Sequence, residues 1–377
     1  MIRALPLLLT LAMLIPCVRA APAGPQVNAA SAILMEKETG TVLYENNAHE
    51  KLEPASVTKV MTLLLIMESL DSGRIKKEDM VSVSAYAASM GGSQVFLEEG
   101  EQMSVHDLLK CIAVSSANDA AVAMAEHLTG SEAAFVDRMN SRAAELGMKD
   151  THFSNCTGLP VGEHYTSAHD IALMSRQLIL HHPDIQSYAT IWMDSIRGGA
   201  FGLSNTNRLI RFYNGATGLK TGFTDSALYC LSATAERDGM ELISVIMKSP
   251  TSDDRFQAAK TLLDYGFANY SLTTVHPDQA LAPVEILLGE CDHVQPELSR
   301  ECRLLLPRDS TGQITTELLV AQDVEAPVEE GQRLGQMIVR VNGEVCDEVP
   351  IVATQGVTRL SFPGIFSRLF RRMLMAG

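Results

Sequence analysis

Residues 54–70 of this 377-residue sequence read PASVTKVMTLLLIMESL. From position 57 onward the stretch is rich in Leu, Met, Thr and Val and contains neither Gly nor Pro, which predicts a mostly buried helix. Asp71 and Gly73 end the pattern. Ser56 and Lys59 are three positions apart at the start of this helix, so their side chains lie on one helix face. The stretch therefore predicts a core helix whose N-terminus presents a serine and a lysine.

This serine–lysine pair could be a nucleophile together with the base that activates it. A serine hydroxyl reacts slowly at neutral pH unless a base removes its proton. The Lys59 amine can be that base only when it is neutral, and burial or a nearby cation lowers a lysine pKa in that direction. The helix N-terminus adds backbone N–H groups for an oxyanion. However, roughly one or two Ser-x-x-Lys patterns are expected by chance in such a chain, and a plain helix start with a solvated lysine is the simpler interpretation.

A second polar motif, Ser116-Ala117-Asn118, lies between two predicted helices and is the only Ser-x-Asn pattern in the sequence. A polar loop in this place can project into a cleft. There, Ser116 would relay a proton, and Asn118 would hydrogen-bond substrate or Lys59. In the simpler interpretation, Ser116 or Asn118 caps the helix that begins at Asp119. The two roles are compatible.

A third motif, Lys220-Thr221-Gly222, also occurs once, inside the turn-rich segment 215–224. A glycine lets a substrate backbone approach a strand closely. The Lys220 cation and the Thr221 hydroxyl suit a terminal carboxylate. The simpler interpretation is a turn and an edge strand with a surface lysine.

Strand patterns flank these motifs, and helical patterns lie between them. An alternating stretch at 31–35 and an apolar run at 41–44 predict a hairpin. Runs at 228–235 and 241–248 predict two more strands, joined by an Asp-Gly turn at 238–239. Strands at both ends with helices between them indicate a sheet assembled from distant segments, with a helical insert. Further helices are predicted at 105–114, 120–128, 132–146, 167–180 and 253–265.

The sequence changes character after about residue 271, where helical periodicity fades. Short β-like runs occur at 284–288 and 315–320. Two longer runs, at 337–341 and 344–352, flank Asn342-Gly343, which fits a type I′ hairpin turn. A small β domain is therefore predicted at 275–355.

Both ends of the chain carry apolar segments that indicate export and membrane contact. Residues 1–20 have a positive start, an apolar run and small residues at the end, which predicts a secretory signal peptide. Residues 362–377 place bulky apolar side chains at helical spacing, with Arg368, Arg371 and Arg372 on the intervening face. These arginines suit anionic lipid headgroups, so we predict a helix that lies on the outer face of the cytoplasmic membrane. The alternative is a helix docked on the β domain.

The composition excludes some functions. The formal net charge is −15, which gives the protein no electrostatic attraction to nucleic acid. Six cysteines follow the predicted signal peptide, and Cys291 and Cys302 could face each other across a hairpin. Separate small buried side chains are the alternative. The sequence contains no Cys-x-x-Cys or His-Glu-x-x-His pattern, so no metal site is predicted.

Each motif is weak by itself, but the three occur once each in the order Ser-x-x-Lys, Ser-x-Asn, Lys-Thr-Gly. In this order and context the chain resembles the low-molecular-mass D-alanyl-D-alanine carboxypeptidases, peptidase family S11, over nearly the whole mature chain. Supporting phrases lie at 53–62, 116–120, 145–153 and 218–224. The resemblance implies an α+β fold, in which a β-lactamase/transpeptidase-like domain at 28–270 has a five-stranded antiparallel sheet, flanking helices and a helical lobe. A small all-β, sandwich-like domain would follow.

The resemblance also implies a reaction and a role for each motif residue. Ser56 would be the acyl-ester nucleophile, Lys59 the general base and Ser116 the third catalytic residue. The reaction would release the terminal D-alanine of peptidoglycan stems that end in D-Ala-D-Ala, without a cofactor. β-Lactam antibiotics would inhibit it by acylating Ser56. The substrate-binding residues would be Asn118, Lys220, Thr221 and Phe223, with the backbone N–H groups of Ser56 and Phe223 as the oxyanion hole.

Two departures from the family pattern concern the substrate carboxylate. Members often carry Asp directly before the Gly that precedes the Lys-Thr-Gly strand, where this sequence has Thr217. Some members also place an arginine shortly upstream, and Arg208 does not align clearly with that position.

Three other functions are compatible with some of these features. A DD-endopeptidase or transpeptidase would use the same site. A class A β-lactamase would need a deacylating glutamate, for which Glu163 is the only nearby candidate, and it would have no use for a further domain. A catalytically silent wall-binding protein would not need three intact motifs. Penicillin turnover and D-alanine release distinguish these possibilities.

Overall fold

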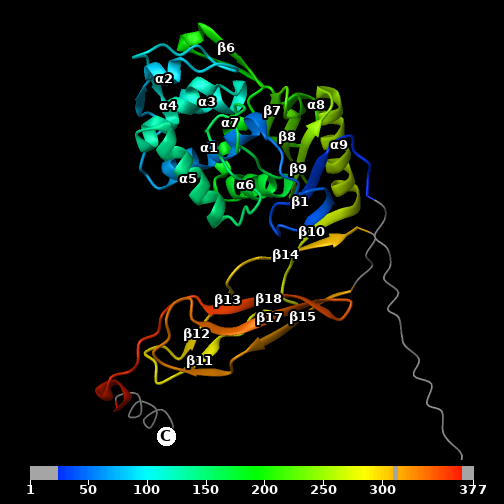
Figure 1. Ribbon diagram of the computed structural model, residues 1–377. Helices are drawn as coiled ribbons and strands as arrows, with labels where there is room; N and C mark the ends of the chain where they lie inside the picture. Colours follow the sequence, from blue (N-terminus) through cyan, green and yellow to red (C-terminus); the bar gives the residue numbers. More distant parts are fainter. Residues whose placement is uncertain (1–23, 309–312, 367–377) are drawn as a thin grey trace, which may run out of the picture.

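The computed structural model describes residues 24–308 and 313–366. Figure 1 shows two bodies, a larger one of helices and strands and a smaller one made mainly of strands. In the larger body, strands from both ends of its sequence meet in one sheet, and most of the helices come from the segment between them. The predicted α+β class, with a helical insert in a sheet of distant segments, is confirmed.

A five-stranded antiparallel sheet forms the centre of the larger body. The predicted N-terminal hairpin is present, and its first strand also pairs with a strand some 200 positions later, so that Ile33 lies opposite Val245. The Asp238-Gly239 turn has both residues at positive φ, 52° and 75°, as a type I′ turn requires. In order across the sheet, the strands are β2 (Val42–Asn46), β1 (Ser31–Glu36), β9 (Met240–Ser249), β8 (Leu228–Arg237) and β7 (Ala216–Thr224).

Different helices cover the two faces of this sheet. Side chains alternate between the faces along a strand, so Ile33 and Met35 enter one apolar core, whereas Ala32 and Leu34 enter another. The first core continues into the helical insert, and the second is closed by the helix α9 (Ser252–Asn269). The central strands are therefore enclosed between two packed layers.

The helix α1 (Lys59–Asp71) runs through the middle of the insert with most of its side chains buried, as predicted. Three of the helices around it begin at serines, Ser104, Ser131 and Ser167, whose hydroxyl groups accept a hydrogen bond from a backbone N–H in the first turn. These longer helices and α4 enclose α1, and the short helices are peripheral. The elements are α2 (Ala85–Ala88), α3 (Val105–Ser115), α4 (Asn118–Thr129), α5 (Glu132–Glu145), α6 (Ala168–His181), α7 (Gln186–Ala189) and α8 (Leu209–Phe212).

Three local features differ from the sequence expectations. The helix predicted from residue 57 is preceded by a 3₁₀ turn, η1 (Ala55–Thr58). The segment 215–224, interpreted as turn-rich, is the edge strand β7, because pairing with β8 overrides the weak strand propensity of its glycines. Two small two-stranded sheets were not predicted, since strands of three or four residues show too little alternation. They are β3 (Met80–Ser82) with β4 (Gln102–Ser104), and β5 (Met193–Ile196) with β6 (Phe201–Ser204).

The smaller body contains the predicted Asn342-Gly343 hairpin, with both residues at positive φ, 55° and 87°. Its two strands contribute Val339 and Val349 to an apolar core. The predicted small all-β architecture is confirmed for the described part of this region. The strands are β10 (Tyr270–Val275), β11 (Val284–Leu287), β12 (His293–Val294), β13 (Pro296–Leu298), β14 (Cys302–Pro307), β15 (Ile314–Val320), β16 (Asp323–Glu325), β17 (Arg333–Val341) and β18 (Glu344–Ala353).

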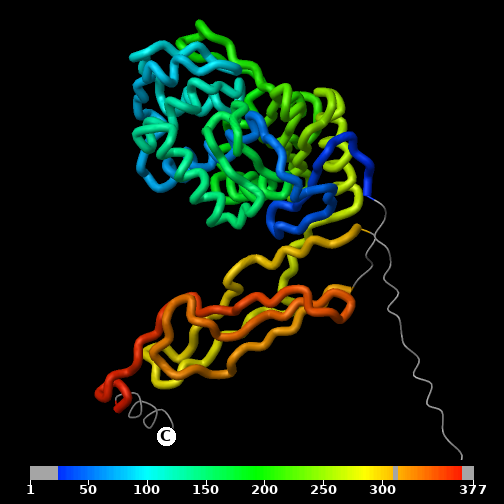
Figure 2. The backbone as a smooth tube through the Cα atoms, viewed as in Figure 1, coloured from blue at the N-terminus to red at the C-terminus, as the bar shows by residue number. Residues whose placement is uncertain are grey.

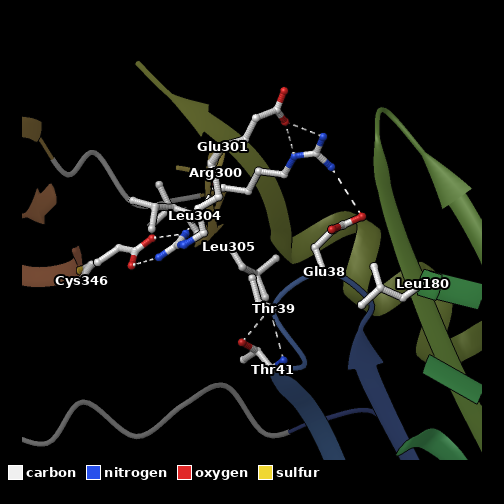
Figure 3. Close-up of a pocket in the computed structure, with 12 residues that line it drawn as sticks. Glu38, Thr39, Thr41, Leu180, Arg300, Glu301, Leu304, Leu305 and Cys346 are labelled. Atoms are coloured by element: carbon white, nitrogen blue, oxygen red, sulfur yellow. Dashed lines mark hydrogen bonds and ion pairs between the residues drawn. The ribbon is translucent and has the colours of Figure 1, made fainter. Parts of the chain in front are cut away.

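The two bodies meet where the chain leaves α9 and enters β10, which pairs with β14 (Figure 2). A cavity of about 830 Å³ lies at this junction (Figure 3). Its charged groups pair with one another: Arg303 Nη1 lies 3.5 Å from Glu38 of the larger body, and Arg300 Nη2 lies 2.6 Å from Asp347. None of the three sequence motifs lines this cavity.

The six cysteines after the predicted signal peptide all lie in the described part of the chain, and all are free. The pairing of Cys291 with Cys302 across a hairpin is therefore wrong. Cys291 is exposed, Cys302 is buried in β14, and the strands β12 and β13 separate them in the sequence. The alternative of small buried side chains holds for Cys111, Cys156 and Cys230 as well as for Cys302.

The predicted signal peptide at 1–20 lies outside the described residues, as does most of the predicted amphipathic helix at 362–377. Over residues 24–308 and 313–366, no helix combines the length and the apolar character that crossing a membrane requires.

Candidate active site

The lysine of the Ser-x-x-Lys motif contacts both the second motif and a loop that follows it in the sequence. The Lys59 amine donates hydrogen bonds to the side-chain oxygen of Asn118 at 2.6 Å and to the carbonyl of Thr157 at 2.7 Å. Its nitrogen also lies 3.1 Å from the hydroxyl of Ser56. The first two motifs, about 60 positions apart in the sequence, are therefore in direct contact.

The turn η1 places Ser56 and Lys59 at the start of α1. Ala55, which precedes the serine, has a positive φ of 48°, so the chain turns sharply before the nucleophile. The turn is also tightly enclosed, because a Cβ on Gly158 would lie 1.8 Å from the Ala55 carbonyl oxygen. Lys59 is completely buried as a result, and the interpretation of this residue as a solvated lysine is wrong.

Burial lowers the pKa of Lys59 to about 7, although Cys156 and Asp119 act in the opposite direction. No carboxylate within the described residues forms an ion pair with Lys59. A neutral amine has two hydrogens and one lone pair. In the neutral amine, the two hydrogens are donated to the Asn118 and Thr157 oxygens. The lone pair can then accept a hydrogen bond from the Ser56 hydroxyl. The geometry is that of a nucleophile with its general base.

Ser116 lies in the bend between α3 and α4, in the left-handed conformation with φ of 64°. Its hydroxyl is buried and has no hydrogen-bond partner. The helix α4 begins at Asn118 with Ala117 at its N-cap, and no side chain caps it. The capping interpretation of Ser116 and Asn118 is therefore wrong.

Asn118 and its neighbour Asp119 form hydrogen bonds with the loop 91–97. The Asn118 side-chain amide donates to the Gly91 carbonyl at 2.7 Å. The buried Asp119 carboxylate accepts hydrogen bonds from the backbone N–H groups of Val95 and Leu97, both at 3.0 Å. Sequence reasoning did not single out Asp119, because an acidic residue in the first turn of a helix is common.

Lys220 of the third motif is also buried, with 1% of its surface exposed. Burial is the main reason that its pKa lies well below the ordinary lysine value, and the nearby cations Lys59 and Arg255 lower it further. Its amine donates to the Thr221 carbonyl at 3.0 Å. The interpretation of this residue as a surface lysine is wrong.

The strand β7 lies directly against the turn that carries Ser56. A Cβ on Gly222 would lie 2.7 Å from the Pro54 carbonyl oxygen and 3.0 Å from the Ser56 backbone nitrogen. Only glycine fits there, because a real Cβ does not approach so closely. Phe223, the next residue, stacks on Tyr229 with the ring centroids 4.4 Å apart. The third motif therefore borders the nucleophile.

Arg255 on α9 is a residue near the site that sequence reasoning missed. Its guanidinium donates to the carbonyls of Gly222 and Cys230, at 3.1 and 3.2 Å. Burial lowers its pKa to about 10, and its Nε atom is buried without a partner. A lone arginine on a helix, 33 positions after Gly222, offers no signal that periodicity or spacing could detect.

The two departures near the third motif have a structural explanation. Thr217 donates its hydroxyl to the buried carboxylate of Glu241 at 2.6 Å, and Glu241 also pairs with Lys37 at 2.9 Å. Arg208 lies on the surface, where it pairs with Asp253 at 3.1 Å. Glu163, the candidate glutamate of the β-lactamase alternative, is exposed.

The site combines a serine beside a buried lysine, a second serine and a Lys-Thr-Gly edge strand. Together with the helical lobe and the antiparallel sheet, these features define a serine hydrolase of the penicillin-recognising kind. Comparison with known proteins specifies the family. Residues 18–251 match the family described as Peptidase S11, D-alanyl-D-alanine carboxypeptidase, and residues 270–359 match the C-terminal domain of penicillin-binding protein 5. The chain belongs to the D-alanyl-D-alanine carboxypeptidase family.

Individual relatives agree with this assignment. The chain is 42% identical to the D-alanyl-D-alanine carboxypeptidase DacF of Bacillus subtilis over 339 residues, which are 89% of this chain and 87% of the relative. It is 33% identical to DacA of Escherichia coli over 354 residues, or 91% and 87% of the two chains. Its fold matches penicillin-binding protein 5 of Haemophilus influenzae with a TM-score of 0.76 and 28% identity, covering 90% of this chain and 100% of the other.

Proposed function

We propose that this protein removes the terminal D-alanine from peptidoglycan stem peptides that end in D-Ala-D-Ala, through an ester on Ser56. The observation that carries the proposal is the Lys59 amine, which is buried, has a pKa of about 7 and lies 3.1 Å from the Ser56 hydroxyl. A serine in this setting can lose its proton as it attacks a carbonyl.

In the acylation step, Lys59 takes the proton from Ser56, and Oγ forms a bond to the carbonyl carbon of the penultimate D-alanine. The backbone N–H groups of Ser56 and Phe223 stabilise the oxyanion. The peptide C–N bond then breaks, and the free Ser116 hydroxyl relays a proton to the leaving amine of the terminal D-alanine. Water subsequently hydrolyses the ester, with Lys59 again as base.

The terminal carboxylate of the substrate binds beside Lys220 and Arg255. These two side chains are close enough for their charges to interact, and neither forms an ion pair within the described residues. A carboxylate placed on β7 would complete this arrangement, with hydrogen bonds from Lys220 and Thr221. The unpaired Nε of Arg255 supports a contribution from this residue, directly or through the Gly222 carbonyl that it contacts.

A fluorescent penicillin and a D-Ala-D-Ala pentapeptide test the proposal together. We expect a stable label on the wild-type chain and release of D-alanine from the peptide. A Ser56→Ala variant should show neither while remaining folded. Rapid penicillin hydrolysis without D-alanine release would identify a β-lactamase, and cleavage of cross-linked stems in preference to pentapeptide would identify an endopeptidase. Absence of any label would refute the assigned reaction.

We also propose that the chain is exported and then held at the membrane surface by the segment 362–377. The sequence pattern of this segment and of residues 1–20 supports this. We propose in addition that the domain bounds are those predicted from the sequence, 28–270 and 275–355. Deletion of the residues after Phe362 should release the protein from vesicles that contain anionic lipid. Retention of the truncated chain on those vesicles would contradict the anchor.

A further inference from the structure

Thr58 lies between the nucleophile and its base, yet the proposed reaction does not use it. Its side chain is completely buried, and its hydroxyl oxygen is 2.8 Å from Nε2 of His164. His164 follows 106 positions later and is itself buried, with 4% of its surface exposed. A buried imidazole therefore contacts the middle of the Ser-x-x-Lys motif from a distant segment of the chain.

The proton on this imidazole can be placed from its partners. Nδ1 of His164 accepts a hydrogen bond from the backbone N–H of Ser154 at 3.0 Å. A neutral imidazole has one acceptor and one donor nitrogen, so Nε2 carries the proton and donates it to Thr58. Burial, with a smaller effect from His152, lowers the pKa of His164 to about 4. The ring is therefore neutral near pH 7 and is fixed at both nitrogens.

His164 connects the turn η1 to the loop 152–166, which closes on itself through a backbone bridge between His152 and Tyr165. The same loop contributes the Thr157 carbonyl that accepts a hydrogen bond from the catalytic lysine. It also contacts the turn at Gly158, beside the Ala55 carbonyl. The loop thus holds η1 at two points, and the hydrogen bond from the imidazole is one of them.

We propose that His164 is a positioning residue for acylation: its Nε2–H fixes Thr58 and thereby the placement of Lys59 against the loop. The inference rests on the proposed function, because the placement of Lys59 affects a measurable rate only if Ser56 is acylated. His164 contacts neither the reacting atoms nor the substrate-binding strand β7, so its effect passes through Thr58.

The groups around Lys59 indicate how a change in its placement would alter its pKa. The titratable groups that act on Lys59 are Cys156, Asp119 and Lys220, and none of them forms an ion pair with it. Burial lowers the pKa of the Lys59 amine to about 7, so that neutral and protonated forms are both present near pH 7. A looser turn would admit water to the amine, raise its pKa and reduce the fraction of neutral base.

Two matched pairs of variants separate positioning from simple packing. His164→Gln keeps an N–H donor at about the position of Nε2, whereas His164→Asn keeps an acceptor near Nδ1 and loses the contact with Thr58. Thr58→Val removes the hydroxyl at nearly constant volume, whereas Thr58→Ser retains it. The measurement is the second-order rate constant of acylation of the full chain by a fluorescent penicillin across a pH series, with a thermal unfolding curve for each variant.

We expect His164→Asn and Thr58→Val each to lower the rate constant at pH 7 by about tenfold, the effect of one lost hydrogen bond. Both should move the acid limb of the pH profile to higher pH. His164→Gln and Thr58→Ser should stay within about threefold of the wild type. The double variant of His164→Asn and Thr58→Val should be no slower than either single variant, because both remove the same contact.

A folded His164→Asn variant with the wild-type rate constant and pH profile would overturn the inference, and so would additive effects in the double variant. If His164→Asn does not fold, the comparison of Thr58→Val with Thr58→Ser tests the inference instead. Equal acylation rate constants for these two variants would overturn the inference. A wild-type chain that takes no label would overturn the proposed function and this inference together. A labelled wild type with unaffected variants would overturn the inference alone.

Discussion

At Lys59, three neutral oxygens replace the water that normally surrounds an ammonium group. The oxygens belong to Ser56, Asn118 and Thr157, and no carboxylate within the described residues is paired with the amine. An uncompensated buried charge is costly, so such a lysine releases its proton more easily than a solvated one. The same residue would be inert as a base on the surface, where its pKa would remain near 10.5.

The acylation rate should therefore depend on pH through Lys59. Its neutral form is the active base and its pKa is about 7, so we expect the rate constant for penicillin acylation to rise as pH increases through about 7. A stopped-flow series with a fluorescent penicillin measures this limb. A rate constant that is flat from acid to neutral pH would contradict the role of Lys59 as general base.

Arg255 should act on substrates through their carboxylate. Replacement by Gln is expected to lower kcat/KM for a D-Ala-D-Ala peptide by about tenfold or more, the effect of losing a charged hydrogen-bond donor. The loss should largely disappear for the same peptide with a C-terminal amide, which has no carboxylate. Arg208→Gln is the matched control, because Arg208 lies on the surface beside Asp253. An equal loss on both peptides would assign Arg255 a purely structural role.

Among the elements, the contact between the edge strand β7 and the turn η1 shapes the site. Pairing with β8 holds β7 in place, and the buried network of Thr217, Glu241 and Lys37 fixes its first residues. On the other side, η1 is held by the loop at Gly158 and by α1, which continues from it. The oxyanion donors proposed here belong one to each element, so the distance between β7 and η1 sets their spacing.

Gly222→Ala should disturb this contact selectively. The added Cβ would lie 2.7 Å from the Pro54 carbonyl oxygen, so we expect a loss of stability of about 1–3 kcal/mol from overpacking together with slower acylation. Gly202→Ala on β6 is the control, because a Cβ there has no neighbour within 4 Å. Chemical denaturation and penicillin labelling measure both effects. A Gly222→Ala variant that is as stable and as reactive as Gly202→Ala would refute the close approach.

At the scale of the whole molecule, the site belongs to the larger body alone. Among residues 24–308 and 313–366, the hydrogen-bond partners of Lys59, Lys220 and Arg255 all lie before the end of α9 at Asn269. The smaller body joins through β10 and through the partly exposed ion pair of Arg303 and Glu38. In Figure 1 the smaller body lies below the larger one, and β7, which carries the third motif, is the edge strand of the sheet opposite β2.

Breaking the ion pair between the bodies should leave the chemistry unchanged. Arg303→Ala is expected to change stability by less than about 1 kcal/mol, because exposed ion pairs contribute little, and the penicillin acylation rate should stay at the wild-type value. Thermal unfolding and labelling of the full chain check both. A clear fall in the acylation rate would show that the smaller body influences the site.

The local elements were largely predictable from the sequence. The apolar run that forms α1 has the composition and length of a buried helix, and the Asp238-Gly239 and Asn342-Gly343 pairs adopt the positive φ that type I′ turns need. The strand β7 was less predictable, because its glycines have low strand propensity and pairing with β8 makes the segment extended. The three motifs were recognisable because their order and spacing are themselves sequence properties.

The sequence by itself thus determined the three motifs and the family to which the chain belongs. Only the tertiary structure decided the environment of each side chain: Lys59 and Lys220 are buried, Arg208 is exposed, and Arg255 and His164 approach from α9 and from the loop 152–166. The physical reason is that burial and hydrogen bonding between distant segments set a pKa, and these depend on packing that no local pattern records.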